Sequence, residues 1–154
     1  MKKVNLLLVS LLTLVAISVS FSSCDKDDEG NSSSIIGKWT FVSVAWDVQN
    51  PTDPDAAAQA RASANFGPVF MQGMTYEFKA DKTVAMTVPA LGQFNTGSYT
   101  YDGNHLTIIY TGGDPRDATA TVKKGVLTII QNWLDDEVQS SGFTKFDQIQ
   151  TFKK

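Results

Sequence analysis

From Ile35 to the end of the chain, β-branched and aromatic residues alternate with polar ones, and Gly, Asp and Asn interrupt the alternation at short intervals. A period of two is typical of strands that bury one face, and the interruptions are typical of hairpin turns. We therefore predict eight antiparallel strands. They are expected at residues 37–48, 74–79, 83–88, 97–101, 105–111, 118–123, 126–134 and 143–152.

One segment departs from this alternation. In "PTDPDAAAQARASANFG", Asp53 can cap a helix that begins at Pro54, and Gly67 can end it. Alanine dominates between them, which favours a helix. We predict one helix at about 54–66, inserted between the first and second strands.

The predicted strands each carry one apolar face, so the sheet must close on itself or find a partner. Eight antiparallel strands suffice to close a meander barrel, and the fold class is therefore predicted as all-β, with a two-sheet β-sandwich as the alternative. Several large side chains are expected to face the interior and to contact a ligand if the barrel is hollow. These are Tyr76, Phe78, Met86, Tyr99, Tyr101, Tyr110 and Trp133.

Whether these side chains surround a cavity or simply fill the barrel stays open at this point. An eight-stranded barrel can be packed completely with its own side chains. Two small residues, Ala118 and Ala120, lie on the same face of the sixth strand and would leave room for a ligand. Buried tyrosine hydroxyls also require hydrogen-bond partners, which a polar-tipped ligand could supply.

The first 23 residues differ from the rest of the chain. Lys2 and Lys3 precede an apolar run from Leu6 to Val19, and small residues follow that run. A basic start, a short apolar middle and a small-residue end are typical of a signal peptide. A membrane-spanning helix needs about 20 apolar residues, so an uncleaved anchor helix is the weaker alternative.

Cys24, the only cysteine, directly follows this segment in the sequence "FSSC". That sequence resembles a bacterial lipobox, which implies a signal peptide over 1–23 and acyl chains such as palmitate on Cys24. The next five residues are Asp25, Lys26, Asp27, Asp28 and Glu29. They resemble the surface-export signal of Gram-negative lipoproteins, which implies an outer-membrane lipoprotein that faces the cell exterior.

Charge and composition divide the remaining chain into a tether and one domain. Residues 24–34 are charged, small and polar, which is typical of a flexible tether, and residues 35–154 have the length of one domain. Without Lys2 and Lys3, 11 basic residues stand against 16 acidic ones, a net charge of −5. Such a surface repels phosphate backbones, so nucleic acid is excluded as a partner, and membrane contact is expected only through the N-terminal lipid.

Residues that could carry catalysis are few. His105 is the only histidine and follows the "DGN" turn, where we expect it to be solvated. Acidic residues gather in two predicted loops, Asp114 with Asp117 and the run Asp135, Asp136 and Glu137. Two suitably spaced carboxylates could hydrolyse a glycoside, but acids also crowd into ordinary turns. We predict no catalytic residues, no metal site and no cofactor.

Gly37 and Trp39 form a G-x-W sequence at the start of the first predicted strand. With the meander that follows, this start resembles the lipocalin-like domains of the calycin group. The resemblance implies that Gly37 and Trp39 form the base of an eight-stranded barrel. A helical insertion after the first strand is similar to that of fatty-acid-binding proteins, in which helices cover the barrel mouth.

Three functions remain open from the sequence. The leading hypothesis is a surface-tethered lipoprotein that binds a small apolar or amphipathic ligand without transforming it. The second is a non-enzymatic interaction module with a filled barrel, which recognises a protein or glycan through exposed aromatics such as Trp46 or Phe94. A carboxylate-dependent hydrolase is the third.

Overall fold

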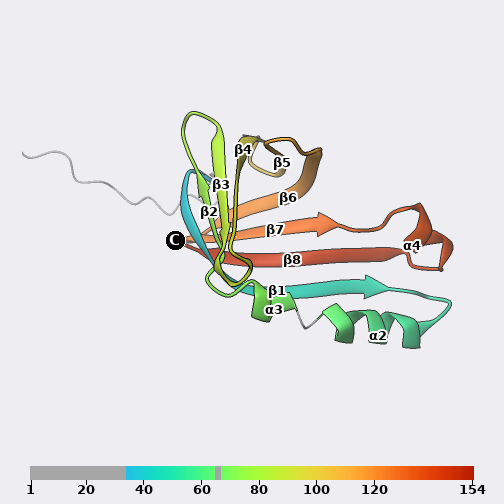
Figure 1. Ribbon diagram of the computed structural model, residues 1–154. Coiled ribbons are helices and arrows are strands. Elements are labelled where there is room, and N and C mark those ends of the chain that lie inside the picture. Colours follow the sequence, from blue (N-terminus) through green and yellow to red (C-terminus); the bar gives the residue numbers. More distant parts are fainter. Residues whose placement is uncertain (1–33, 65–66) are drawn as a thin grey trace, which may run out of the picture. The chain divides into compact units, whose positions relative to one another are not determined.

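The computed structural model describes residues 34–64 and 67–154 (Figure 1). The predictions for the signal peptide, Cys24, the charged residues 25–29 and the tether as far as Ser33 lie outside the described residues. Eight strands make up most of the domain. They are β1 Gly37–Gln49, β2 Thr75–Phe78, β3 Thr83–Val88, β4 Gln93–Tyr101, β5 His105–Tyr110, β6 Pro115–Lys123, β7 Val126–Asn132 and β8 Lys145–Lys153.

Each strand pairs antiparallel with its neighbour in sequence, and β8 pairs with β1 to close the barrel. The predicted eight-stranded meander barrel is therefore confirmed, and the sandwich alternative is wrong. The β2–β3, β4–β5 and β6–β7 turns lie with the start of β1 at one end, which we call the closed end. The β1–α2, β3–β4, β5–β6 and β7–β8 connections lie at the other, which we call the open end.

Strand β1 contains an irregularity that changes which of its residues face inward. Phe41 pairs with Phe152 and Ser43 pairs with Thr151, so Val42 is an extra residue. A bulge of this kind shifts the alternation by one position. As a result, odd-numbered Trp39 and even-numbered Trp46 both belong to the inner face of one strand.

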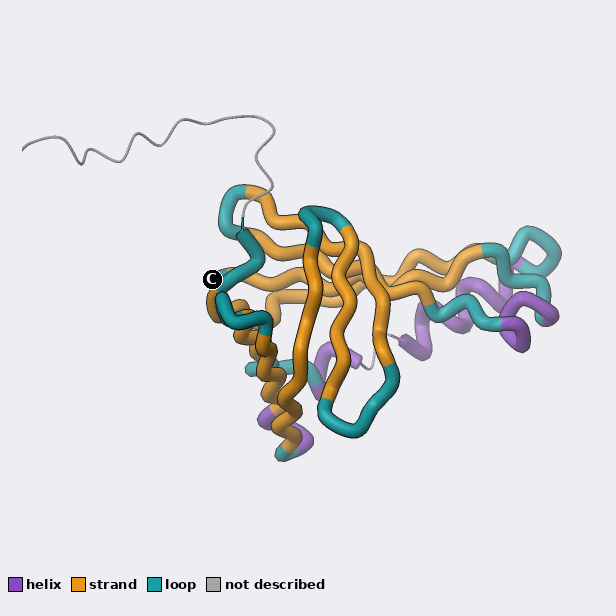
Figure 2. The backbone as a smooth tube through the Cα atoms, turned by 90° about the horizontal axis from the view of Figure 1, so that it is seen from above, coloured by secondary structure: helices purple, strands orange, loops and turns teal. Residues whose placement is uncertain are grey.

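Beyond the bulge, β1 leaves β2 and continues with β8 and β7 as a three-stranded extension (Figures 1 and 2). We use this name for residues 43–49 of β1, 145–151 of β8 and 128–132 of β7. Strand β2 pairs only with residues 37–40 of β1, so the extension projects past the shorter strands. Its inner face therefore forms one wall of the open end.

Helix α2 (Pro54–Ala64) runs beside the extension, against β1 (Figure 1). Asp53 caps it as predicted, because its carboxylate accepts a hydrogen bond from the Ala56 backbone N–H at 2.9 Å. The helix is described as far as Ala64, and the last two residues of the predicted range, 65–66, lie outside the described residues. None of the helices in the described part of the chain has the length and apolar character needed to cross a membrane.

Three short helical segments were not predicted. They are α3 (Gly67–Phe70), the 3₁₀ turn η1 (Pro89–Leu91) and α4 (Asp136–Ser140). The acidic run 135–137 was expected in a loop, but Asp135 caps α4 by accepting from the Val138 N–H at 2.8 Å. Buried Asn50 links this region to the other side of the extension, because it donates to the Ser141 carbonyl.

Two strands begin earlier than the alternation indicated. Strand β4 starts at Gln93 rather than at residue 97, and β6 starts at Pro115 rather than at residue 118. Asp117, which was expected in a loop, is therefore a strand residue. Gly97 hid the length of β4, since a glycine within a strand is read as a break. A Cβ atom there would lie 2.1 Å from the Ile109 carbonyl oxygen, so only glycine fits.

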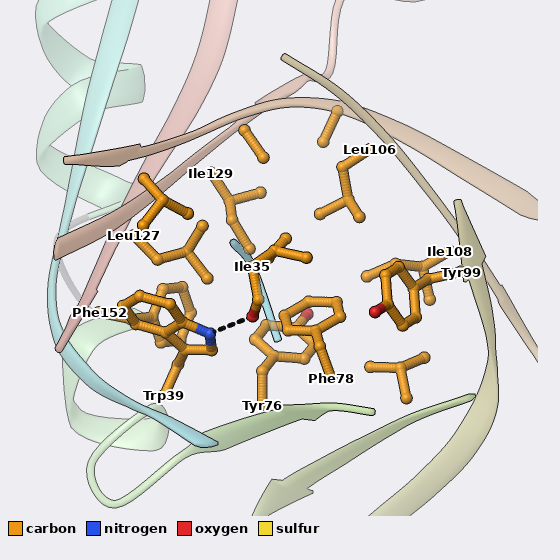
Figure 3. Packing of buried hydrophobic residues seen from close by; sticks show 14 of the residues in the cluster. Ile35, Trp39, Tyr76, Phe78, Tyr99, Leu106, Ile108, Leu127, Ile129 and Phe152 are labelled. Atoms are coloured by element: carbon orange, nitrogen blue, oxygen red, sulfur yellow. Dashed lines mark hydrogen bonds between the residues drawn. The ribbon is translucent and has the colours of Figure 1, made fainter. Parts of the chain in front are cut away.

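Large buried side chains fill the closed end of the barrel (Figure 3). Trp39 is fully buried, and its indole N–H donates to the Ile35 carbonyl at 2.6 Å. The ammonium group of Lys154, the residue after β8, lies 4.9 Å from the centre of the Trp39 ring and makes a cation–π contact with it. Phe78 and Phe152 pack beside it as further buried aromatics.

We predict that Trp39→Ala lowers the free energy of unfolding by about 3–5 kcal/mol, because it removes a fully buried aromatic and leaves a cavity. The matched control is Phe94→Ala, since Phe94 is 67% exposed on β4 and its removal should change stability by no more than about 0.5 kcal/mol. Denaturant unfolding followed by circular dichroism measures both. Equal losses in the two variants would contradict this account of the closed end.

Candidate functional site

A cavity of about 160 Å³ lies at the open end, between the barrel interior and the extension. Its lining combines an apolar floor with polar groups near the mouth. The floor residues are Met74, Met86, Leu106, Ile108, Ala118 and Ile129, and the remaining lining residues are Tyr76, Tyr110, Arg116, Gln131, Trp133, Gln148 and Gln150. The barrel is thus filled at one end and hollow at the other.

Two tyrosine hydroxyls meet at the cavity wall. Tyr110 donates to the Tyr76 hydroxyl at 3.3 Å and also lies 3.3 Å from the Met86 sulfur. Burial raises the pKa of Tyr76 well above its ordinary value of 10.0, and neighbouring Tyr110 raises it further. Burial also raises the pKa of Tyr110. Both hydroxyls are therefore protonated at neutral pH and can act as hydrogen-bond donors.

Three glutamine side chains form a cluster on the inner face of β7 and β8. Gln150 donates through Nε2 to the Gln148 oxygen at 2.6 Å and to the Gln131 oxygen at 3.4 Å. Only 5% of Gln150 is exposed, and its own Oε1 has no hydrogen-bond partner within the described part of the chain. A buried acceptor without a donor is costly, and a donor from a ligand or a water would reach this oxygen through a small movement of the Gln150 amide at the cavity wall.

Arg116 brings positive charge to the mouth. Its position on β6, opposite Ile108 and two residues before Ala118, puts it in register with the inward-facing residues. Its guanidinium carbon lies 5.8 Å from the centre of the Tyr110 ring. Burial dominates the raised pKa values of Tyr76 and Tyr110, and the Arg116 charge partly offsets the rise in each. The cation therefore acts on both hydroxyls.

Arg116 forms no ion pair with the carboxylates that the structure describes, whereas Lys145 is paired with Asp47 and lies 3.7 Å from Asp147. The Lys145 side chain holds the pKa of Asp47 below its ordinary value. The cation on the extension is thus neutralised by its neighbours. The cation at the cavity is available to an anion from outside.

Aromatic side chains continue the cavity wall onto the extension. Trp133 follows the last residue of β7, donates its backbone N–H to the Phe146 carbonyl at 2.8 Å, and is 49% exposed. The Trp46 ring centre lies 6.4 Å from that of Trp133 and 5.7 Å from that of Phe146. This cluster forms an apolar rim on one side of the mouth.

The structure separates the predicted ligand-binding residues into two groups. Tyr76, Met86, Tyr110 and Trp133 line the cavity, whereas Phe78, Tyr99 and Tyr101 do not. The hydroxyls of the last two are already used at the closed end, where Tyr99 donates to the Lys79 carbonyl and Tyr101 to the Gly103 carbonyl, both at 2.8 Å. Gly37 and Trp39 also lie at the closed end.

Sequence reasoning missed the polar half of the cavity. Gln131 lies two residues after Ile129, and Gln148 and Gln150 continue the alternation that leads to buried Phe152. Inward positions were recognised by apolar side chains, so polar residues in the same register were passed over. Extending the period of two through every residue of each strand would have found the glutamines and Arg116.

Helix α2 does not cover the mouth as the fatty-acid-binding comparison implied. It packs against β1, which beyond residue 40 pairs with β8 on one side and has no strand partner on the other, and it contributes no residue to the cavity wall. Its contact with β1 instead shields a strand edge that would otherwise be free.

The groups considered for catalysis lie away from the cavity. Of the described residues, no Asp or Glu lines it. His105 is exposed on β5, and its Nε2 lies 3.4 Å from the Asp117 carboxylate and 3.3 Å from the Thr107 hydroxyl. A catalytic triad requires its hydroxyl and carboxylate on opposite ring nitrogens, and here both approach the same one. No group of three metal-ligating residues occurs in the described ranges.

A closed eight-stranded barrel with a cavity at its open end is the architecture of a ligand-binding barrel. Residues 35–129 match the model of a family described as a lipocalin-like domain. The match covers more than half of the chain, so the chain belongs to this family and the expected membership is confirmed. The chain matches no curated protein and no solved structure.

We predict unequal effects from the same substitution at two glutamines. Gln150→Leu removes the buried acceptor that has no partner together with the Nε2 group that donates to Gln148 and Gln131, so the gain and the loss offset each other and the free energy of unfolding should change by no more than about 1 kcal/mol. Gln148→Leu removes the acceptor of a buried N–H and should lower it by about 1–3 kcal/mol. Thermal and denaturant unfolding measure the free energy of unfolding of each variant and of the parent. A larger loss for Gln150→Leu than for Gln148→Leu would contradict the account of Gln150 Oε1 as an unsatisfied, destabilising acceptor.

Proposed function

We propose that the protein is a surface-tethered lipoprotein that binds a small apolar or amphipathic molecule in its barrel and does not transform it. The cavity of about 160 Å³ carries this proposal, because its apolar floor and polar mouth match the two ends of an amphipathic molecule. Membership of the lipocalin-like family supports ligand binding in general.

Two observations favour binding without chemistry. The family is in general one of non-enzymatic binding proteins. Within the described residues, the cavity wall holds neutral tyrosines, amides and one arginine, but no carboxylate, histidine or cysteine. Such a set can orient a ligand by hydrogen bonds and charge, whereas the carboxylate-dependent hydrolase would need two acids facing one cleft.

The position of the chain's entry into the barrel supports a particular orientation at the membrane. Ile35 is buried under Trp39 at the closed end, and the cavity lies at the open end. A lipid on Cys24, joined through residues 25–34, would therefore attach the domain by its closed end. The lipid would then hold the closed end nearest the membrane, and the predicted flexible tether would let the mouth face the medium that supplies the ligand.

An interaction module is the alternative proposal. Phe94 is 67% exposed on β4 and Leu91 is 50% exposed in η1, and neither lines the cavity. Exposed aromatic and aliphatic side chains of this kind can contact a partner protein. The cavity favours the carrier function, because its lining brings a buried unpartnered acceptor and a cation together.

We predict that Cys24→Ala moves the protein from the membrane fraction to the soluble fraction, because it removes the acylated side chain. Each buried acyl CH₂ contributes about 0.8 kcal/mol, so loss of the chains removes most of the membrane affinity. Fractionation of cells followed by immunoblotting measures the change, and Ser33→Ala in the same tether is the matched control. Membrane retention of Cys24→Ala would sink the lipoprotein proposal, and protease resistance on intact cells would sink the outward orientation.

We predict that the Cys24→Ala chain, purified without detergent and incubated with cell extract, shows a small-molecule adduct in native mass spectrometry. Ala118→Phe should abolish the adduct, because Ala118 lines the cavity and a phenyl ring there fills it. Ala85→Phe on β3 lies outside the cavity lining and should leave the adduct intact. An adduct that survives Ala118→Phe would place the ligand elsewhere and favour the interaction module.

A further inference from the structure

The size of the cavity limits what can enter it. An apolar cavity of about 150 Å³ admits a single benzene ring, and this one measures about 160 Å³. One six-membered ring therefore fills the apolar floor. A long acyl chain such as palmitate, with well over twice the carbon atoms of benzene, would leave most of its length outside the barrel.

Gln150 places a second requirement on the ligand, which concerns hydrogen bonding. Both N–H groups of Gln150 are directed to Gln148 and Gln131, so its Oε1 can only accept. This oxygen is inaccessible to bulk solvent, has no donor among the described residues, and belongs to a residue that lines the cavity. A ligand that satisfies it must bring a hydroxyl or an N–H group.

The opposite chemistry is required at Arg116 and Tyr76. The guanidinium has no carboxylate partner among the described residues, and the Tyr76 hydroxyl accepts from Tyr110 and so has its own proton free. Both groups line the cavity and both are donors. Together they suit an anionic oxygen, because hydrogen bonds to ionised groups are about twice as strong as neutral ones.

We propose that the cavity binds a small ring compound that carries one anionic group and one hydroxyl or N–H donor, a class whose simplest members are the hydroxybenzoates. The ring lies on the apolar floor, the anionic oxygens accept from Arg116 and Tyr76, and the hydroxyl donates to Gln150 Oε1. This inference rests on the proposed carrier function and narrows its ligand to one chemical class. A sugar does not fit, because its hydroxyls would face Met74, Leu106 and Ile129 without partners.

The test titrates the Cys24→Ala chain with five probes and follows binding by calorimetry and NMR. The probes are hydroxybenzoate (meta and para isomers separately), benzoate, phenol and palmitate. We expect one hydroxybenzoate isomer to bind at least about tenfold more tightly than benzoate, which lacks the donor, and than phenol, which lacks the charge.

Two variants assign the contacts. Arg116→Gln should weaken hydroxybenzoate about tenfold or more and leave phenol unchanged, and Gln150→Leu should reduce hydroxybenzoate to the affinity of benzoate. The matched controls are Arg61→Gln on α2 and Gln93→Leu on β4, which do not line the cavity and should bind hydroxybenzoate as the parent does. A circular dichroism spectrum confirms that each variant is folded.

The possible failures are distinguishable. If phenol binds as tightly as hydroxybenzoate, or if Arg116→Gln changes nothing, the anionic ring is the wrong ligand class. If palmitate binds and the ring compounds do not, the carrier function stands and this narrower inference is overturned. If neither these probes nor cell-extract lipids bind, both the carrier function and the inference fall.

Discussion

The pairing of β1 with β8 is the constraint on which the rest of the molecule depends. It joins the two ends of the described domain, and by closing the sheet it leaves no free edge around the closed end. Because this ladder runs from Thr40 to Gln49, it also carries β8 past the barrel and builds the extension. Closure and the polar wall of the cavity are thus products of the same set of hydrogen bonds. Strand β8, with Gln148 and Gln150, lies outside the residues that match the family model.

The two ends of the barrel have different roles: the closed end stabilises the fold, and the open end holds the cavity. At the closed end, aromatic side chains such as Trp39, Phe78 and Phe152 fill the interior and supply the burial that stabilises the fold. At the open end, small Ala118 leaves space and Gln150 leaves an unsatisfied oxygen, which are both unfavourable for folding alone. Packing at the closed end can offset the unfavourable terms at the open end, because the domain folds as one cooperative unit and its stability is the sum over both ends.

Most of the fold could be predicted, because alternation identifies strands and short polar turns identify a meander. The position of a residue along the barrel axis could not be predicted. Tyr99 and Tyr110 both face inward in the sequence pattern, and only the structure places Tyr99 at the closed end and Tyr110 at the open end. The bulge at Val42 was also hidden, because one extra residue in a long strand leaves no composition signal. Arg116 and the glutamines were missed for a different reason: inward polar residues are recognisable only once the strands are in register.

The bulge at Val42 has a consequence for how such a barrel can change over time. It separates β1 into a first part, which packs at the closed end, and a second part, which belongs to the extension and the mouth. Insertion or loss of one residue there would exchange the inner and outer faces of Val44, Trp46 and Val48 while the register below stayed as it is. One strand thus joins the packed closed end to the wall of the mouth at a single extra residue, and a change there could alter the mouth without altering the rest of the barrel.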